Sequence, residues 1–375
     1  MKTMHRICFG DSREIKEIKN EAVDLVVTSP PYPMIAMWDS VFSEQNPNIK
    51  TALDGGCGEV AFELMNQELD KVWRGVYRLL KEGGIACINI GDATRTLNGR
   101  FQLYPTHARI LKSCQEIGFH VLPEILWRKP TNAPNKFMGS GMLPVCAYVT
   151  LEHEHILILR KGSKREFKSD DAKRLRRESS FFWEERNQWF SDVWFNLNGI
   201  SQRLNKVEPR QRSAAYPFEL AYRLINMFSI KGDTVFDPFI GTGTTTVAAM
   251  GSGRNSIGME ISSGFNEMIL SKINSLPNFA NGYIEKRISR HLEFIQEYAE
   301  NKGPLSNKSD YYGFSCVSSN ETGIFFNRLL GIKNSFENVF EVSYEETPKR
   351  ELMPLVAQMF VEVTKQEKQG TLVTF

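Results

Sequence analysis

The residues best suited to chemistry form two short polar segments, far apart in the chain. Residues 28–32 read Thr-Ser-Pro-Pro-Tyr, and residues 237–245 read Asp-Pro-Phe-Ile-Gly-Thr-Gly-Thr-Thr. Each segment follows a short apolar run, at residues 24–27 and 235–236. Polar loops at the ends of buried strands are where open α/β sheets bind ligands. The two segments are therefore the first candidates for a site.

The first segment offers two hydrogen-bond acceptors in a stiff loop. The hydroxyl oxygen of Ser29 is one, and the carbonyl of Pro30, held by two consecutive prolines with fixed φ, is the other. Acceptors around an aromatic NH₂ group favour a tetrahedral nitrogen, whose lone pair is then free to attack. Tyr32 adds a flat face for an aromatic ring. In isolation, Ser-Pro-Pro-Tyr would favour the alternative of a stiff turn after a strand.

The second segment predicts a loop that lets a ligand touch the backbone. Gly241 and Gly243 carry no side chains. Thr244 is expected to cap a helix whose N-terminus points at the ligand. Glu260 ends the next expected strand, where nucleotide sites place a carboxylate for ribose hydroxyls.

Other interpretations of this loop are weaker. A phosphate-binding P-loop requires Gly-Lys-Ser/Thr, and that tripeptide is missing from the sequence. A dinucleotide fingerprint requires a third glycine where Thr246 stands. A glycine turn without any ligand remains open.

Taken together and in this order, the two segments resemble the DNA amino-methyltransferases, which methylate cytosine N4 or adenine N6. The resemblance covers about residues 6–260, and the order of the segments matches the circularly permuted β group of that family. It implies a Rossmann-like α/β fold with a mostly parallel sheet, and S-adenosylmethionine as cofactor. The implied catalytic residues are Ser29, Pro30, Pro31 and Tyr32, with the target base extruded onto Tyr32. The implied cofactor-binding residues are Asp11, Ser12, Asp237, Pro238, Phe239, Gly241, Gly243, Thr244, Thr245 and Glu260.

Two points of this resemblance leave alternatives open. Asp11 would meet the adenine ring of the cofactor, although Asp11 and Ser12 would also suit a helix cap or turn. Serine at position 29 is typical of cytosine-N4 enzymes, whereas aspartate or asparagine is usual for adenine N6. Cytosine N4 is therefore expected, with adenine N6 as the alternative. Cytosine-C5 transfer is excluded because it needs a cysteine nucleophile, usually after proline, and Cys146 follows Val145.

DNA contact requires a local basic patch, because the formal net charge is only +2. A basic run followed by aromatic residues occupies residues 160–195, where the resembling family carries its target-recognition region. A basic surface loop without a partner is the alternative. The expected DNA-binding residues are Lys161, Lys164, Arg165, Arg174, Arg176 and Arg177.

Four regions are expected along the chain. Residues 1–160 would form a catalytic half with the amino-group clamp, 161–212 the target-recognition region, and 213–265 the cofactor-binding half of the same domain. Residues 266–375 would form a C-terminal helical extension of unknown role. Glycine at residues 83–84 is expected to end a helix over 62–80, and residues 38–59 look mobile enough to close over the base.

The remaining expectations concern location and partners. Six scattered cysteines without C-x-x-C spacing and no long apolar run predict a reduced cytoplasmic protein without zinc or membrane span. His153 and His155 are interpreted as ordinary polar residues. The expected partner is double-stranded DNA, with a separate restriction endonuclease that shares the recognition site. The rival functions are an inactive nucleic-acid-binding protein with this fold, and an RNA or small-molecule methyltransferase.

Overall fold

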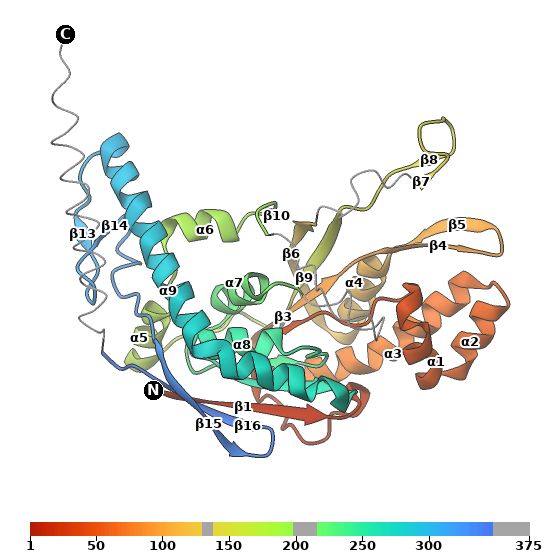
Figure 1. Ribbon diagram of the computed structural model, residues 1–375, viewed down its shortest axis with the longest axis horizontal. Coiled ribbons are helices and arrows are strands. Elements are labelled where there is room, and N and C mark those ends of the chain that lie inside the picture. Colours follow the sequence, from red (N-terminus) through yellow and green to blue (C-terminus); the bar gives the residue numbers. More distant parts are fainter. Residues whose placement is uncertain (130–137, 198–215, 348–375) are drawn as a thin grey trace, which may run out of the picture.

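The computed structural model describes residues 1–129, 138–197 and 216–347. Within them, one ten-stranded sheet forms the centre of the molecule, with helices against it (Figure 1). Across the sheet the strands are β10 (Val193–Trp194), β6 (Phe119–Arg128), β9 (His153–Lys161), β3 (Leu80–Ile90), β2 (Val23–Thr28), β11 (Thr234–Asp237), β12 (Asn255–Glu260), β1 (Lys2–Phe9), β16 (Val339–Tyr344) and β15 (Leu329–Phe336).

The middle of the sheet is parallel. Strands β3, β2, β11, β12 and β1 all run in one direction, whereas β9 and β16 pair antiparallel on the two sides. In the register, Val235 lies opposite Leu25 and Phe236 opposite Val26. The carboxyl ends of β2 and β11 are therefore neighbours, although they are far apart in the chain.

Helices cover both faces of the sheet at strand β2. All six of its residues are buried. Val23 and Val26 pack into one core with α1 (Asp39–Gln45), α2 (Pro47–Asp54), α3 (Gly58–Leu79) and α4 (Thr106–Ile117). Leu25 and Val27 pack into a second core with α7 (Phe218–Phe228) and α8 (Thr244–Gly251). Alternate residues of a strand point to opposite faces, so a continuous apolar run fits a strand between two helical layers.

The C-terminal part contains the expected helix and an unexpected hairpin. Helix α9 (Asn266–Lys302) has 37 residues, which is roughly 55 Å of helix. After it come the short pair β13 (Asn307–Lys308) and β14 (Ser315–Cys316), then β15 and β16, which extend the main sheet beside β1. Among the described helices, α9 included, none combines the length and apolar character needed to cross a membrane. The expected extension also covers residues 348–375, which lie outside the described residues.

One local expectation is wrong. Helix α3 ends at Leu79 and β3 begins at Leu80, so the glycines at 83–84 do not end the helix. Gly83 has φ +80° inside β3, where the pairing shifts between Val23–Leu80 and Leu25–Ile85. The left-handed glycine therefore serves a β-bulge. Most of the stretch at 38–59 forms α1, α2 and the start of α3, and its closure over the base stays a prediction.

Two short helices follow β9 in the chain, α5 (Asp170–Glu178) and α6 (Trp183–Trp189). The last residue of α6, Trp189, packs into the core that holds α7.

Two small hairpins, β4 (Ala93–Leu97) with β5 (Arg100–Tyr104) and β7 (Met138–Gly139) with β8 (Ala147–Tyr148), project away from the sheet (Figure 1).

Candidate active site

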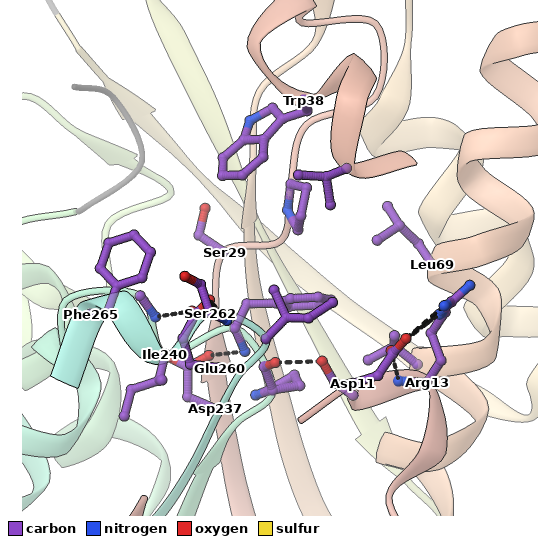
Figure 2. A pocket seen from close by; sticks show the side chains of 18 of the residues that line it. Asp11, Arg13, Ser29, Trp38, Leu69, Asp237, Ile240, Glu260, Ser262 and Phe265 are labelled. Atoms are coloured by element: carbon purple, nitrogen blue, oxygen red, sulfur yellow. Dashed lines mark hydrogen bonds and ion pairs between the residues drawn. The ribbon is translucent and has the colours of Figure 1, made fainter. Parts of the chain in front are cut away.

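The two polar segments meet in one pocket at the carboxyl ends of β1, β2, β11 and β12. Figure 2 shows Ser29 and Trp38 across the opening from Glu260 and Phe265. Most of the expected residues line this pocket: Asp11, Ser12, Ser29, Pro31, Asp237, Pro238, Phe239, Gly241, Thr244 and Glu260. Pro30, Tyr32, Gly243 and Thr245 are not part of its wall.

Asp237 joins the two segments. Its Oδ1 accepts hydrogen bonds from the Thr28 hydroxyl at 2.6 Å and the Phe239 N–H at 3.0 Å. Its Oδ2 accepts from the hydroxyls of Thr245 at 2.6 Å and Tyr216 at 3.3 Å. The side chain is buried, and burial raises the pKa of Asp237 against the opposing effect of these donors. Four protein donors thus contact this carboxylate, which also lines the pocket. Its expected contact with the cofactor stays a prediction.

Glu260 closes the glycine loop from the next strand. Its Oε2 accepts from the Gly241 N–H and its Oε1 from the Ser262 N–H, both at 3.0 Å. Burial raises the pKa of Glu260, although these N–H groups act against it. Each oxygen keeps a lone pair for a ribose hydroxyl. From the segment after β1, the Ser12 hydroxyl donates to the Pro238 carbonyl at 2.7 Å and ties a third segment to the loop.

Asp11 forms the helix cap that the sequence offered as one of two interpretations. It caps a short 3₁₀ helix and accepts from the Arg13 N–H at 2.9 Å. The guanidinium of Arg13 lies 2.6 Å from Asp11 Oδ2 and 2.6 Å from Glu68 Oε2. Burial acts to raise the pKa of Asp11, but the hydrogen bonds and charge of Arg13 outweigh it and lower that pKa. The side chain thus stays an acceptor on the pocket wall.

The two glycines of the loop have different reasons to be glycine. A Cβ on Gly241 (φ +51°) would meet only the Phe239 carbonyl, at 3.9 Å. A Cβ on Gly243 (φ +82°) would lie 3.2 Å from Ile269 of α9. A side chain at position 243 would therefore meet α9, and would not enter the space that was expected for a ligand. Thr244 does not cap α8 either, because Gly243 is the N-cap and Thr244 the first helical residue.

Several wall residues were missed because no motif contains them. They are apolar and come from three separate stretches of the chain: Trp38, Phe42, Leu69, Ile261 and Phe265. Lys272, which contacts the glycine loop from outside this wall, was also missed. Its ammonium donates to Thr242 Oγ1 at 2.6 Å, and burial lowers its pKa to about 8. A cation beside the glycine loop suits a ligand with a carboxylate.

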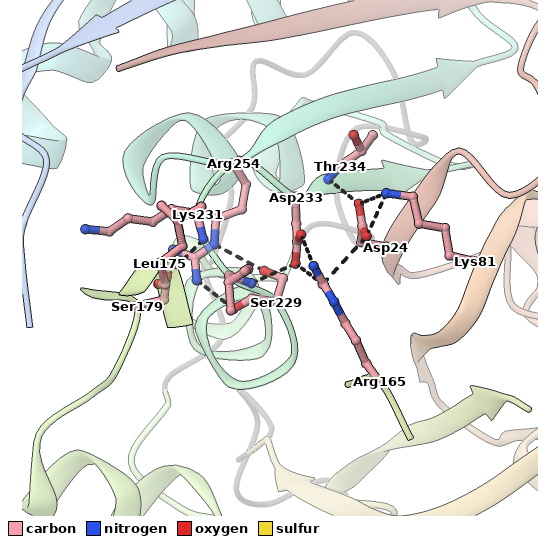
Figure 3. Close-up of polar contacts among 12 residues, drawn as sticks. Asp24, Lys81, Arg165, Leu175, Ser179, Ser229, Lys231, Asp233, Thr234 and Arg254 are labelled. Carbon is pink, nitrogen blue, oxygen red and sulfur yellow. Dashed lines mark hydrogen bonds and ion pairs between the residues drawn. The ribbon is translucent and has the colours of Figure 1, made fainter. Parts of the chain in front are cut away.

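The basic run lies at the edge of the sheet opposite the pocket. Arg165 Nη1 lies 2.6 Å from Asp233 and 3.6 Å from Asp24. Figure 3 shows Arg165 directed at both acids. These acids stand at the starts of β11 and β2, and Lys161 donates to the carbonyl of Leu80 at the start of β3. Lys161 and Arg165 therefore make ion pairs and hydrogen bonds within the protein at the amino edge. Their expected contact with DNA stays a prediction.

Helix α5 holds the rest of the run near the same edge. Its end is tied to the segment before β11, since Ser179 Oγ accepts from the Lys231 N–H at 2.9 Å. Arg174 pairs with Glu178 at 2.8 Å, and Arg176 lies over the Phe167 ring at 4.7 Å. Arg177 and Lys164 belong to the same stretch of chain. The remainder of the expected target-recognition region, residues 198–212, lies outside the described residues.

Candidate metal ligands gather in two places within the described part of the chain. His155 stacks on His107 at 3.8 Å, and His107 Nδ1 lies 2.8 Å from Asp92. His153 is outside this group. The absence of a catalytic metal stays a prediction. The two groups are Asp92, His107 and His155, and Glu184, His291 and Glu321.

Comparison with known proteins decides the family. The family model described as "DNA methylase" matches residues 23–272, which include both polar segments. The chain belongs to the DNA methylase family. It is 51% identical over 358 residues to the type II methyltransferase M.MthZI of Methanothermobacter thermautotrophicus, covering 94% of this chain and 98% of that protein. It is 49% identical over 306 residues to M.MjaI of Methanocaldococcus jannaschii, covering 78% and 97%.

A solved structure supports the cofactor of this DNA methyltransferase. The putative DNA modification methylase TTHA0409 of Thermus thermophilus, complexed with S-adenosyl-L-methionine, is 31% identical. It superposes with a TM-score of 0.56 over 72% of this chain and 92% of that one. S-adenosylmethionine is the cofactor of the methyltransferase. The pocket suits it, because Glu260 offers acceptors, Gly241 opens the backbone, and Trp38 and Phe265 supply apolar walls.

The two glycines should separate ligand binding from folding. Gly241→Val should weaken S-adenosylmethionine binding at least about tenfold, because the side chain is added on the open side of the loop. Both substitutions are strained at positive φ, but only a Cβ at 243 would also meet Ile269, at 3.2 Å. Gly243→Val should therefore mainly lower the free energy of unfolding, by about 1–3 kcal/mol. Calorimetric titration and thermal melting of both variants measure the two effects. A Gly243→Val protein with native stability and no cofactor binding would contradict this division.

The position of α5 predicts that its arginines do not set DNA affinity. Neutralising Arg174, Arg176 and Arg177 together should leave the slope of log affinity against log salt within about half a unit of wild type, since each lost phosphate contact lowers it by about one. Binding to a duplex is measured over a salt series. A slope reduced by about two or three units would restore the DNA path along α5.

Proposed function

We propose that the protein methylates the exocyclic N4 group of cytosine in duplex DNA, after the base is flipped out of the helix. One observation carries the proposal: Ser29, the glycine loop that begins at Asp237, and Glu260 all line one pocket. This pocket lies at the neighbouring ends of β2 and β11. A methyl donor held by the second segment would then lie beside an amine held by the first. The order of the segments supports membership of the permuted β group.

The proposed chemistry is alignment of a poor nucleophile. The lone pair of an aromatic amine is delocalised into its ring, so the amine attacks only when its nitrogen becomes tetrahedral. Ser29 and the Pro30 carbonyl would accept hydrogen bonds from the two N–H groups and hold that geometry. S-adenosylmethionine supplies a methyl group on a positively charged sulfur. Tyr32 would stack on the base.

Cytosine N4 is preferred over adenine N6 because position 29 is serine. Adenine N6 is the alternative, since both amines present two N–H donors to the same acceptors. Single-molecule sequencing of DNA from cells that express the protein reports the modified base and its sequence context together. N4-methylcytosine at one recurring site supports the proposal, and N6-methyladenine replaces it with the alternative.

The biological role that we propose is the modification half of a restriction–modification system, with the endonuclease on a separate chain. The relatives M.MthZI and M.MjaI are type II methyltransferases that match nearly all of their length. We assign residues 1–160 and 213–265 to one catalytic domain, and target recognition to the part of 161–212 that follows α5. Residues 266–347 add α9 and the β15–β16 hairpin to that domain.

A nucleic-acid-binding protein without activity is the rival from another class. The intact Ser29–Tyr32 segment and the lined pocket argue against it. Transfer of tritiated methyl groups to duplex DNA, RNA and free nucleosides, assayed in parallel, distinguishes the DNA enzyme from the inactive binder and from the RNA or small-molecule methyltransferase.

Removal of the Ser29 hydroxyl should affect turnover rather than cofactor binding. Ser29→Ala should lower kcat by roughly 10²-fold, the usual effect of losing one polar group that acts in a transition state. The affinity for S-adenosylmethionine should stay within about twofold, because Glu260 and Gly241 belong to the other segment. Calorimetry and single-turnover methyl transfer check both values. Lost cofactor binding with native turnover would overturn the assignment of Ser29.

A further inference from the structure

A chain of hydrogen bonds leads from Ser29 away from the pocket. Ser29 Oγ lies 3.2 Å from Tyr32 Oη, and Tyr32 Oη lies 3.0 Å from Glu154 Oε2. Glu154 is the second residue of β9, which pairs with β3 next to β2. Because β9 runs antiparallel, its start lies at the carboxyl end of β3 and hence beside the loop that carries Ser29.

The neighbours of Glu154 fix the direction of this chain. Asn89 Nδ2, near the end of β3, donates to Tyr32 Oη at 3.0 Å and to Glu154 Oε2 at 2.8 Å. Lys129 Nζ donates to Glu154 Oε1 at 2.9 Å. If the Asn89 amide were turned by 180°, its Oδ1 would face the carboxylate of Glu154, and two acceptors would lie against each other. A carboxylate only accepts hydrogen bonds, so the single proton of Tyr32 is directed to Glu154.

The consequence reaches the pocket through Ser29. The oxygen of Tyr32 has given its proton to Glu154 and accepts from Asn89, so it can only accept from Ser29 as well. The Ser29 proton therefore points toward Tyr32 and away from the pocket. The lone pairs of the Ser29 oxygen then face the pocket that it lines. Burial, and then the charge of Glu154, raise the pKa of Tyr32 well above its usual value, so the phenol keeps its proton.

We propose that Ser29, Tyr32 and Glu154 form a one-way relay that makes Ser29 select an amino group over a keto group and carries away the proton of the methylated amine. The inference rests on the proposed function. Glu154 and the hydroxyl of Tyr32 act through Ser29 and so have a positioning role. The relay thereby gives β9, which carries Glu154, a role in the site.

The proton balance of the step is simple. The target nitrogen gains a bond to the methyl carbon as the sulfur–methyl bond breaks, and the nitrogen becomes cationic. It then loses one proton to Ser29 Oγ, whose own proton passes to Tyr32 Oη. The Tyr32 proton passes to Glu154 Oε2, so Glu154 ends as the neutral acid and later releases the proton to water. No oxidant, reductant or metal enters the balance.

The selection by Ser29 is tested without cofactor. The probe is a duplex with the methylated site found by sequencing, with either cytosine or uracil at the target position. The wild-type protein should bind the cytosine duplex about tenfold more tightly, since uracil replaces an N–H donor with a second acceptor. Tyr32→Phe frees the Ser29 proton to point outward, so the ratio should fall to about threefold or less. A Tyr32→Phe protein that keeps the wild-type ratio would overturn the relay.

The proton path is tested with Glu154→Gln, which keeps an acceptor for Tyr32 but removes the group that takes the proton. Single-turnover methyl transfer should slow by roughly 10²-fold, as for loss of a general base, while cofactor-free binding of the cytosine duplex stays within about threefold. The solvent deuterium isotope effect on that turnover should change from the wild-type value. Native rate with a native isotope effect would contradict the proton path.

A matched control sits two residues away. Glu152 pairs with Arg128 at 3.3 Å, outside the relay, so Glu152→Gln should match wild type in ratio, rate and isotope effect. Thermal melting of each variant shows whether a loss comes from misfolding. A protein that methylates DNA but binds both duplexes equally refutes the relay alone, whereas a protein that transfers no methyl group to DNA refutes the proposed function.

Discussion

The buried carboxylate of Asp237 is the contact on which the arrangement of the site depends. It receives the Thr28 hydroxyl from the end of β2 and the Phe239 N–H and Thr245 hydroxyl from the glycine loop. An unsatisfied buried group costs about 1–3 kcal/mol, so each donor is held firmly in place. Because Ser29 follows Thr28 directly, the bond that stabilises the sheet edge also sets the distance between the two reactive segments.

The two edges of the parallel sheet divide the work. At the amino edge, acids at the starts of β2 and β11 bind the cations of Lys81 and Arg165, and these contacts close the edge (Figure 3). At the carboxyl edge, Glu260 and Ser29 face a pocket and keep acceptors available. A cluster of charged residues in the sequence therefore does not predict a ligand site until the edge of the sheet on which it lies is known.

Much of the site was predictable because its signals are local. Proline pairs, glycine loops and a carboxylate at a strand end each imply a geometry within a few residues, and Ser29, Gly241 and Glu260 did reach one pocket. Trp38 and Phe265 could not be predicted, because only the folded chain brings them together. The edge at which the basic run lies could not be predicted for a related reason: strand periodicity predicts that β9 exists but not that it runs antiparallel. The hairpin β15–β16 was missed because β15 lacks regular alternation and both strands carry polar residues.

That hairpin ties the beginning of the chain to its far end. Strand β1 lies at the beginning of the sequence, yet both of its neighbours, β12 and β16, come from the last third of the described residues. The Met1 carbonyl even accepts from the Tyr344 N–H at 3.2 Å. Until β12 and β16 have been synthesised, both backbone edges of β1 are unpaired, a state that invites association with other chains. Rapid closure of the sheet on β1 therefore limits the time in which such association can occur.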